Sequence, residues 1–576
     1  MSVGLKKSPD LSKSVLFVHP KVARAGAYYE FPLGMAYVYA VLKQHNVSVR
    51  FLDLCRRDAP VREQIQDALA SAPTSVVCTG GMSVYFNAIH EVVQAAQEIN
   101  PQITTLVGGA MITADPPLSA QVLRYDYGII GEAEATIREL VDAWRGQRDL
   151  TSVNGLIYRD RDDYVTTAQR GPIKNLDELP RPAYEDFDYA GYLGLATPTC
   201  AGNNFTVLDN PRPASIIGSR SCPFQCTFCY HPLGQIYRQR SLPAIRDEID
   251  FLVRTYQINI LNLLDELFSA NRQRTLDFCE MIAPYKLRWW AQMRVSDVDP
   301  EIIRAMKQSG AYTIPYGVES MSPRILRSMK KKITVEQVDR ALAMTRAEKL
   351  SIQANLIFGD PEEDDSTVRE SLDWWRKHSS YALNLFSMRV IPDSVVYQGA
   401  VKRGLITDKE AFLRQGFPLI NVSRLSQRAF SRLQDFIIWY PNDPRFVRVG
   451  SVTKSTLTGC DTSDRRVFDV TICCPDCNAS MVYRGLRQER SVSFSRFTPI
   501  FCRSCGQRLN IENRHAFRAN YTLAGNTWRH YLTTTLVGFM FRHRWIFSCV
   551  NTLRRTVISD QMTKRMTRWM SRWSAD

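Results

Sequence analysis

Three cysteines lie close together near the middle of the chain. Cys222, Cys226 and Cys229 follow an apolar run that is typical of a buried strand. Thiolates are the ligands of iron–sulfur clusters, and the CxxxCxxC spacing can hold three irons of a cubane while the fourth iron stays open. The alternative is a trio of buried or zinc-binding cysteines, but zinc sites more often use paired CxxC knuckles. We therefore predict a 4Fe–4S cluster on these three cysteines.

A second group of cysteines lies farther along the chain. Cys474 and Cys477 form one CxxC knuckle, and Cys502 and Cys505 form another. Four thiolates can close a tetrahedral structural zinc site. The alternative is an auxiliary iron–sulfur cluster, and the adjacent Cys473 leaves the register of the first knuckle open. We predict zinc in a ribbon-like segment.

The first cysteine loop lies within a series of alternating strand and helix patterns. Six β-rich runs separated by helical patterns predict a partial (β/α)6 barrel, in which chemistry takes place at the carboxyl ends of the strands. The predicted strands are Ser215–Gly218, Ile258–Leu264, Leu287–Met293, Tyr312–Gly317, Ile352–Phe358 and Leu383–Val390.

A separate α/β pattern occupies the first 150 residues and predicts a doubly wound parallel sheet. Its predicted strands are Val15–Val18, Val47–Leu52, Ser75–Thr79, Thr104–Val107 and Tyr127–Ile130. Ligands of such sheets bind at the carboxyl ends of the strands. Here those ends carry small residues, although glycine often serves only backbone geometry at such turns.

Composition and charge limit the classes of protein to which this chain can belong. The chain has 576 residues, of which 45% are hydrophobic and 23% charged, as in globular proteins. No apolar run near the start is long enough for a signal peptide, so the fourteen cysteines indicate a cytoplasmic protein with metal sites. Residues 511–576 carry a net charge of +8, more than half of the total of +15.

The basic tail has an amphipathic pattern. Met562, Trp569 and Trp573 share one helical sector, with Arg568 and Arg572 outside it. We expect a peripheral contact with a membrane surface and not a span, because Arg542, His543 and Arg544 interrupt the centre of the long run Tyr531–Val550. The alternatives are docking of this helix on the catalytic domain, or contact with RNA or another protein.

These patterns divide the chain into five parts. We predict an α/β domain over 1–150, a linker over 151–204 and a barrel over 205–440. A zinc-ribbon-like segment over 441–510 and a basic helical tail over 511–576 complete the chain.

The cysteine loop resembles that of the radical SAM superfamily, in which an aromatic residue, here Phe228, precedes the third cysteine. Asp265-Glu266-Leu267-Phe268, Gly317-Val318-Glu319-Ser320 and Gly359-Asp360-Pro361-Glu362-Glu363 fall at the usual stations of that family. Glu362 replaces a frequent glycine, and Pro392-Asp393-Ser394 replaces Pro-Gly-Thr.

The resemblance implies that the cluster cleaves S-adenosylmethionine (SAM) reductively to give a 5′-deoxyadenosyl radical. It also implies SAM contacts by Phe228, by Glu266 to the amino group, by Arg294 to the carboxylate and by Glu319 to the ribose. The alternative is that these charges form ion pairs at the barrel rim.

The first domain resembles the cobalamin-binding domain of one radical SAM subfamily. The similarity rests on Val107–Thr113, on Gly131-Glu132-Ala133-Glu134 and on Pro32-Leu33-Gly34. The DxHxxG motif of other cobalamin proteins is missing, and Cys55 stands at its histidine position after Asp53. The resemblance implies cobalamin contacts by Thr79, Gly80, Gly108, Gly109, Thr113, Gly131 and Glu132.

The expected function is a cobalamin-dependent radical SAM methyltransferase that acts on a small molecule or lipid, with flavodoxin or ferredoxin as the electron donor. A tRNA-modifying enzyme is the first alternative, although only Cys55 and Cys78 occur where methylthiolating relatives carry three cysteines, so nucleic acid is not the expected partner. An inactive binding protein is the second alternative, and the intact cysteine loop argues against it.

Overall fold

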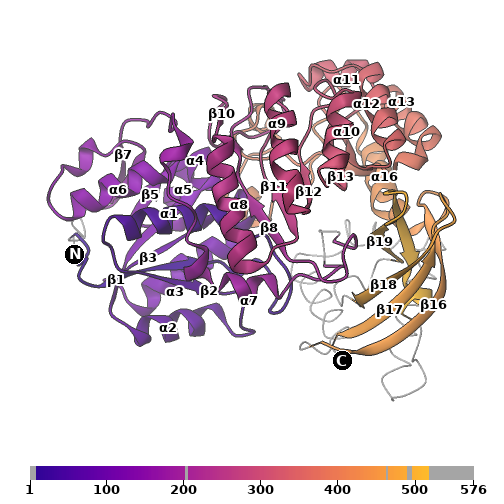
Figure 1. The fold of residues 1–576 in the computed structure, drawn as a ribbon. Coiled ribbons are helices and arrows are strands. Elements are labelled where there is room, and N and C mark those ends of the chain that lie inside the picture. The colour runs from indigo at the N-terminus through magenta and orange to yellow at the C-terminus, as the bar shows by residue number, and fades with distance from the viewer. Residues whose placement is uncertain (1–7, 201–204, 462–464, 489–495, 518–576) are drawn as a thin grey trace, which may run out of the picture.

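The computed structural model describes residues 8–200, 205–461, 465–488 and 496–517. Three sheet-based parts follow one another along the chain (Figure 1). The predicted tail lies outside the described residues from position 518 onward, and so does its amphipathic pattern. None of the helices in the described ranges has the length and apolar character that a membrane span needs.

The first part is a seven-stranded sheet with the order β2-β1-β3-β4-β5-β6-β7. Strands β1 to β5 are parallel, which confirms the predicted doubly wound sheet. The elements are β1 (Ser14–His19), α1 (Leu33–Gln44), β2 (Val49–Asp53), α2 (Val61–Ser71), β3 (Thr74–Gly81), α3 (Phe86–Ile99), β4 (Thr104–Gly109), α4 (Ala110–Ala114), α5 (Pro116–Leu123), β5 (Tyr127–Ile129), α6 (Ala133–Trp144), β6 (Leu156–Asp160) and β7 (Asp163–Thr166).

The predicted linker over 151–204 differs from the structure at its beginning. Strands β6 and β7 form a hairpin that pairs antiparallel with β5, so the sheet extends to Thr166. Farther on, α7 (Tyr189–Leu193) buries Tyr189 and Tyr192 in the main core. This stretch is therefore packed structure, because its aromatic side chains find partners on both neighbouring parts.

The second part contains six parallel strands in two three-stranded sheets, β8-β11-β12 and β13-β14-β15, which isolated parallel bridges from Trp289 to Ala311 and from Met293 to Tyr316 connect. This confirms the predicted partial (β/α)6 barrel. Its elements are β8 (Pro213–Ile216), β9 (Ser219–Arg220), β10 (Arg238–Gln239), α8 (Leu242–Tyr256), β11 (Ile260–Leu263), α9 (Arg272–Ile282), β12 (Arg288–Ala291), α10 (Pro300–Gln308), β13 (Thr313–Glu319), α11 (Pro323–Ser328), α12 (Val335–Ala347), β14 (Ser351–Phe358), α13 (Asp365–Lys377), β15 (Asn384–Ser387), α14 (Val395–Lys402), α15 (Lys409–Arg414) and α16 (Gln427–Trp439).

The barrel helices begin at side-chain caps. The Ser241 hydroxyl accepts the N–H of Ala244 at the start of α8, with proline in the first turn. Thr334 and Asp364 form capping boxes at the starts of α12 and α13. Loss of such a cap costs about 1 kcal/mol, so these residues fix where each barrel helix begins.

The third part is a five-stranded sheet with the order β18-β17-β16-β20-β19. Its elements are β16 (Val449–Cys460), β17 (Arg466–Cys473), β18 (Ser480–Arg487), β19 (Phe497–Phe501), β20 (Arg508–Glu512) and α17 (Asn513–Ala516). The two predicted knuckles connect β17 to β18 and β19 to β20, which places all four cysteines at one end of this sheet.

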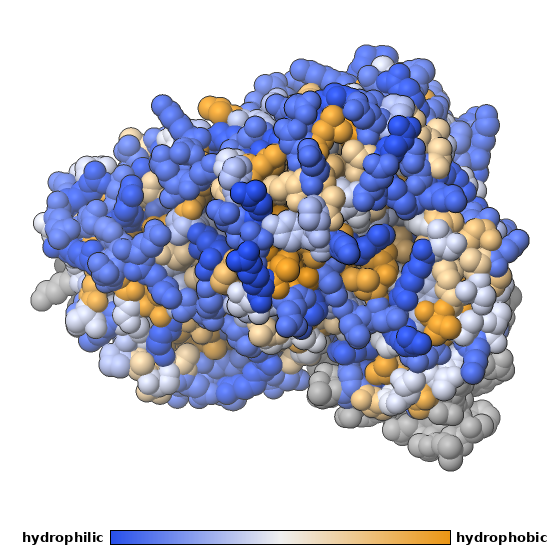
Figure 2. Space-filling model, viewed as in Figure 1, coloured by the Kyte–Doolittle hydropathy of each residue, from blue (hydrophilic) through white to orange (hydrophobic). Residues whose placement is uncertain are grey.

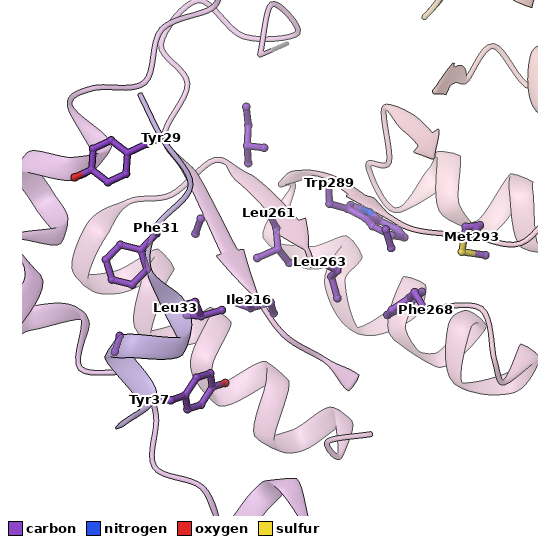
Figure 3. Packing of buried hydrophobic residues seen from close by; sticks show 14 of the residues in the cluster. Tyr29, Phe31, Leu33, Tyr37, Ile216, Leu261, Leu263, Phe268, Trp289 and Met293 are labelled. Carbon is purple, nitrogen blue, oxygen red and sulfur yellow. The ribbon is translucent and has the colours of Figure 1, made fainter. Parts of the chain in front are cut away.

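One hydrophobic core joins the first two parts. Figure 3 shows Phe31, Leu33 and Tyr37 beside Ile216 of β8, with Leu261 of β11 behind. These side chains are buried, and truncation of such a core phenylalanine to alanine typically costs about 3–5 kcal/mol. The sheet and the barrel are therefore packed as one body.

The surface is mostly hydrophilic on the face that Figure 2 shows. Hydrophobic side chains on that face gather in small patches toward the centre of the molecule and over the third part. Ile236 and Phe386 are among the exposed large apolar residues, and scattered residues of this kind are ordinary on protein surfaces.

Candidate active site

The cysteine loop is held at both ends by the barrel. Asp265, directly after β11, accepts hydrogen bonds from the N–H of Gly218 at 2.6 Å and from the hydroxyl of Ser219 at 2.7 Å. At the other end, the N–H of Thr227 donates to the carbonyl of Met329 at 3.1 Å. These contacts fix the segment that carries Cys222, Cys226 and Cys229 at the carboxyl ends of the strands.

Positive charge lies close to the thiols. Lys331 is buried and Arg294 stacks on the ring of Phe224 at 3.7 Å. A hydrogen bond from Cys229, followed by the charges of Lys331 and Arg294, lowers the pKa of Cys226 to about 6 against the effect of burial. Three thiols with neighbouring cations form a donor set that fits an iron–sulfur cluster, because its ligands are thiolates.

The predicted SAM contacts lie around this loop, but each charged one already has a protein partner. Lys331 Nζ donates to Glu319 Oε1 at 2.8 Å, and Glu266 Oε2 lies 3.2 Å from His231 Nδ1. Arg294 Nη2 donates to the carbonyls of Lys331 and Lys332. Glu319 and Glu266 therefore have the ion-pair partners that the sequence left open, whereas Arg294 bonds backbone carbonyls, and contact with SAM stays a prediction.

Phe228, directly before the third cysteine, lies near the buried lysine. Its ring is 5.9 Å from Lys331 Nζ. Lys331 and His231 are residues that the sequence did not single out, because their partners lie far away along the chain. The Nε2 atom of His231 is buried and makes no hydrogen bond within the described residues.

The glycine turns of the first sheet approach one another closely. A Cβ atom at Gly80 would lie 2.3 Å from the carbonyl oxygen of Gly108, and one at Gly109 would lie 2.4 Å from that of Gly81. By contrast, a Cβ at Gly108 would meet nothing within 4 Å, and the same holds for Gly131. Glycine is thus required between the strands, while open space lies beside Gly108 and Gly131 that fits a ligand at the strand ends.

Three other predicted cobalamin contacts are engaged by the protein itself. The Thr79 hydroxyl donates to the carbonyl of Val18 at 2.9 Å. The Thr113 hydroxyl donates to the Gly109 carbonyl at 3.1 Å and accepts from the Gly131 N–H at 2.9 Å. Glu132 is buried against two arginines of the barrel. These side chains shape the turns, and their direct contact with cobalamin stays a prediction.

The segment nearest to the missing DxHxxG motif has a histidine after all, from another strand. His19, at the end of β1, places Nδ1 3.0 Å from Asp53 Oδ1, and Cys55 Sγ is 4.0 Å from the same nitrogen. Tyr29 donates its hydroxyl to Asp53. The sequence did not reveal this pair because the two residues come from neighbouring strands.

The four cysteines of the knuckles lie together. The Sγ atoms of Cys474 and Cys505 are 3.8 Å apart, and those of Cys477 and Cys502 are 3.6 Å apart. Zn–S bonds of about 2.3 Å in a tetrahedron require sulfurs about 3.8 Å apart. Cys473 stays outside this group, since its Sγ donates to the Asn478 carbonyl. The four thiols therefore fit zinc, and the identity of the metal stays a prediction.

Two family models match the chain. Residues 21–141 match the B12 binding domain, and residues 216–374 match the radical SAM superfamily. The first match covers the sheet with the glycine turns, and the second covers the cysteine loop and most of the barrel.

Curated relatives match more than half of the chain. An uncharacterized methyltransferase of Pyrococcus horikoshii is 29% identical over 60% of this chain and 73% of its own length. An anaerobic magnesium-protoporphyrin IX monomethyl ester cyclase of Rubrivivax gelatinosus is 27% identical over 64% and 67%. Cytidylyl-2-hydroxyethylphosphonate methyltransferase of Streptomyces wedmorensis is 23% identical over 69% and 83%.

Solved structures share the fold. The radical SAM methyltransferase TsrM of Kitasatospora setae, with cobalamin and a 4Fe–4S cluster bound, superposes with a TM-score of 0.56 at 19% identity, over 67% of this chain and 78% of that one. The cobalamin-dependent radical enzyme OxsB, with aqua-cobalamin and SAM bound, gives a TM-score of 0.55 at 18% identity, over 74% and 60%.

Proposed function

We propose that this chain, in which residues 21–141 match the B12 binding domain and residues 216–374 match the radical SAM superfamily, is a radical SAM enzyme that methylates a small-molecule or lipid substrate. One observation carries the proposal. The hydroxyl of Tyr230, the residue after the third loop cysteine, donates to the carbonyl of Ala110 at the Gly108-Gly109 turn at 2.9 Å. The cysteine loop and the open space at the glycine turns therefore face one another, as a two-cofactor reaction requires.

Each site has residues suited to its group. Cys222, Cys226 and Cys229 would hold the cluster, and the turns at Gly108 and Gly131 would hold cobalamin. When bound, these groups supply a carbon-centred radical and a transferable methyl group, which are chemistries that protein side chains lack. The protein's own part is to place the groups and to neutralise thiolate charge through Lys331 and Arg294.

The substrate class is inferred from related enzymes. The Streptomyces relative is a methyltransferase of a cytidylyl phosphonate, and a TsrM structure contains tryptophan as the substrate. Such substrates are compact, and a lipid is the alternative within this proposal. A flavodoxin or ferredoxin would supply the electron for the cluster.

Ring closure is the second candidate function. The Rubrivivax relative is a cyclase that covers a similar share of this chain. A cyclase and a methyltransferase differ in one measurable respect, since only the methyltransferase moves the SAM methyl group to the substrate.

The experiment uses the full chain, reconstituted anaerobically with iron, sulfide and hydroxocobalamin. It receives SAM with a trideuterated methyl group, a reductant, and the aqueous or organic-soluble fraction of a cell extract. We expect 5′-deoxyadenosine, S-adenosylhomocysteine and one labelled metabolite by mass spectrometry. Cys226→Ala should lose all three products, and Cys460→Ser, at an exposed cysteine of β16, should retain them.

Other outcomes separate the alternatives. Release of 5′-deoxyadenosine without any labelled product would favour ring closure. Label in RNA would favour the tRNA-modifying enzyme. Equal SAM cleavage by the wild type and Cys226→Ala would contradict the cluster assignment itself.

A further inference from the structure

A buried ion-pair network joins the first sheet to the start of the cysteine loop. Arg220 Nη1 lies 2.8 Å from Glu132 Oε1, and Arg220 Nη2 lies 2.5 Å from Glu134 Oε1. Arg238 Nη1 lies 2.7 Å from Glu132 Oε2. Glu132 directly follows Gly131, and Arg220 stands two residues before Cys222. One guanidinium thus connects a predicted cobalamin turn to the first cluster ligand.

A second contact connects the other end of the cysteine loop to the first sheet. Tyr230, next to Cys229, donates its hydroxyl to the Ala110 carbonyl at 2.9 Å. Three residues after Ala110, the hydroxyl of Thr113 bonds to Gly109 and Gly131. The path therefore runs from Cys222 through Arg220 and Glu132 to one glycine turn, through Thr113 to the other turn, and through Tyr230 back to Cys229.

The charged side chains of this network are buried and paired with one another. The side chains of Glu132, Glu134, Arg220 and Arg238 are all buried, with at most 8% of each residue exposed. Burial raises the pKa of Glu132, but the hydrogen bonds and charge of Arg220 outweigh it and lower that pKa below its ordinary value. Each guanidinium fork meets carboxylates from a different part of the chain, so these ion pairs constrain the position of the loop relative to the sheet.

The ion pairs lie next to the residue that precedes the first cluster cysteine. Ser221, between Arg220 and Cys222, has a left-handed backbone with φ of +68°. Arg238 Nη2 donates to its hydroxyl at 3.1 Å. A shift of Glu132 would therefore move the strained residue that sets the direction of Cys222.

We propose that Arg220 is a positioning residue, which couples occupancy of the glycine turns to the conformation of the cysteine loop. The proposal rests on the proposed function in that it takes cobalamin as the ligand of the turns. Ligand binding at the turns restricts the conformations of Gly131 and Glu132. Through its ion pair with Glu132, Arg220 then restricts the conformations of Ser221 and Cys222. By linkage, a formed cluster must favour ligand binding at the turns by the same factor.

Hydrogen exchange of the full chain tests the coupling without any turnover. We expect hydroxocobalamin to slow exchange in the peptide over 219–231 by about tenfold in the wild type. Arg220→Lys keeps the charge but lacks the planar fork that meets Glu132 and Glu134 together, so it should lose this slowing while it still binds cobalamin by its visible spectrum. Tyr230→Phe leaves no buried charge, should fold normally, and should lose part of the slowing.

The matched control is Arg170→Lys. Arg170 also forks onto a carboxylate in the first part, that of Glu139, but neither residue contacts the cysteine loop. It should respond to hydroxocobalamin as the wild type does. A second measurement is the visible titration of cobalamin, which should bind the cluster-loaded wild type about tenfold more tightly than the cluster-free form, and equally in Arg220→Lys.

The outcomes are distinct. If the wild type binds cobalamin with no change in loop exchange, or if Arg220→Lys and Tyr230→Phe both retain the full slowing, the coupling is overturned and the proposed function stands. If the wild type binds no cobalamin, both are overturned.

Discussion

Gly80 and Gly108 pair across β3 and β4 so closely that a Cβ atom on Gly80 would lie 2.3 Å from the carbonyl oxygen of Gly108. The reverse does not hold, because a Cβ atom on Gly108 would meet nothing within 4 Å. Neither residue has a positive φ, so the difference is one of space alone. Gly80 permits the close approach of β3 and β4, whereas Gly108 borders the open space at the strand ends.

The two glycines should therefore respond differently to substitution. Gly80→Ala should destabilise the protein by about 1–3 kcal/mol, since overpacking forces the strands apart. Gly108→Leu should leave unfolding by urea nearly unchanged but weaken hydroxocobalamin binding at least about tenfold, because the side chain fills the ligand space.

Gly171→Leu serves as the control for a bulky residue at an exposed, open glycine away from the turns. It should retain both the stability and the cobalamin affinity of the wild type. Unchanged cobalamin binding in Gly108→Leu would contradict the location of this site.

Local sequence patterns predicted the helices and strands better than they predicted the contacts between them. The predicted strand Ile352–Phe358 is β14, Ser351–Phe358, since apolar residues that alternate with Gln353 and Asn355 are typical of a half-buried strand. The ion pair between Glu132 and Arg220 spans 88 positions, and neither residue carries a local signal of its partner. The pairing of β6 with β5 was missed for the same reason, because sheet edges are chosen by tertiary packing.

Lys331 and Glu319 should be energetically coupled. The pair is buried, with 2.8 Å between Nζ and Oε1, so Lys331→Met leaves a buried carboxylate without its cation. We expect a loss of about 3–5 kcal/mol in unfolding free energy for this variant. The double variant Lys331→Met, Glu319→Gln should recover most of that loss, because no uncompensated charge remains. Additive effects in a double-mutant cycle measured by urea unfolding would contradict the coupling.

Glu363 should make stability depend on pH. It is 1% exposed, and its Oε1 makes no hydrogen bond among the described residues. Burial raises its pKa from 4.5 to about 8. A raised pKa adds stability that is fully present below the unfolded value and is lost as pH rises through the folded one. The contribution of Glu363 therefore disappears between about pH 4.5 and about pH 8.

Glu363→Gln should remove that loss, since the amide oxygen can still accept from the Gly359 N–H. We expect the variant to match the wild type in urea unfolding at about pH 5 and to exceed it by a few kcal/mol at about pH 8.5. Glu362→Gln, at the neighbouring exposed carboxylate, should follow the wild type at both values. Parallel stability curves for Glu363→Gln and the wild type would refute the buried, raised pKa.

Zinc should stabilise the contacts between the third part and the barrel. Between the cysteine ligands, Asp476 Oδ1 lies 3.3 Å from Arg346 Nη2, and beyond them Gln507 donates to the Leu350 carbonyl at 3.3 Å. Both knuckles thus contact α12 and the residues after it. A metal that fixes the four sulfurs also fixes these contacts, because structural zinc contributes folding energy directly.

We expect about one zinc per chain by elemental analysis, with loss of most of it in Cys477→Ser and none in Cys473→Ser. Cys477 is the ligand of choice because it is exposed and its replacement leaves no core cavity. Zinc should also be released as pH falls, since its ligands are thiolates that protons compete for. In Cys477→Ser, faster hydrogen exchange should appear in β18, β19 and the end of α12, while β1 to β5 stay unchanged. Iron in place of zinc, with a second cluster spectrum that survives Cys226→Ala, would assign the knuckles to an auxiliary cluster instead.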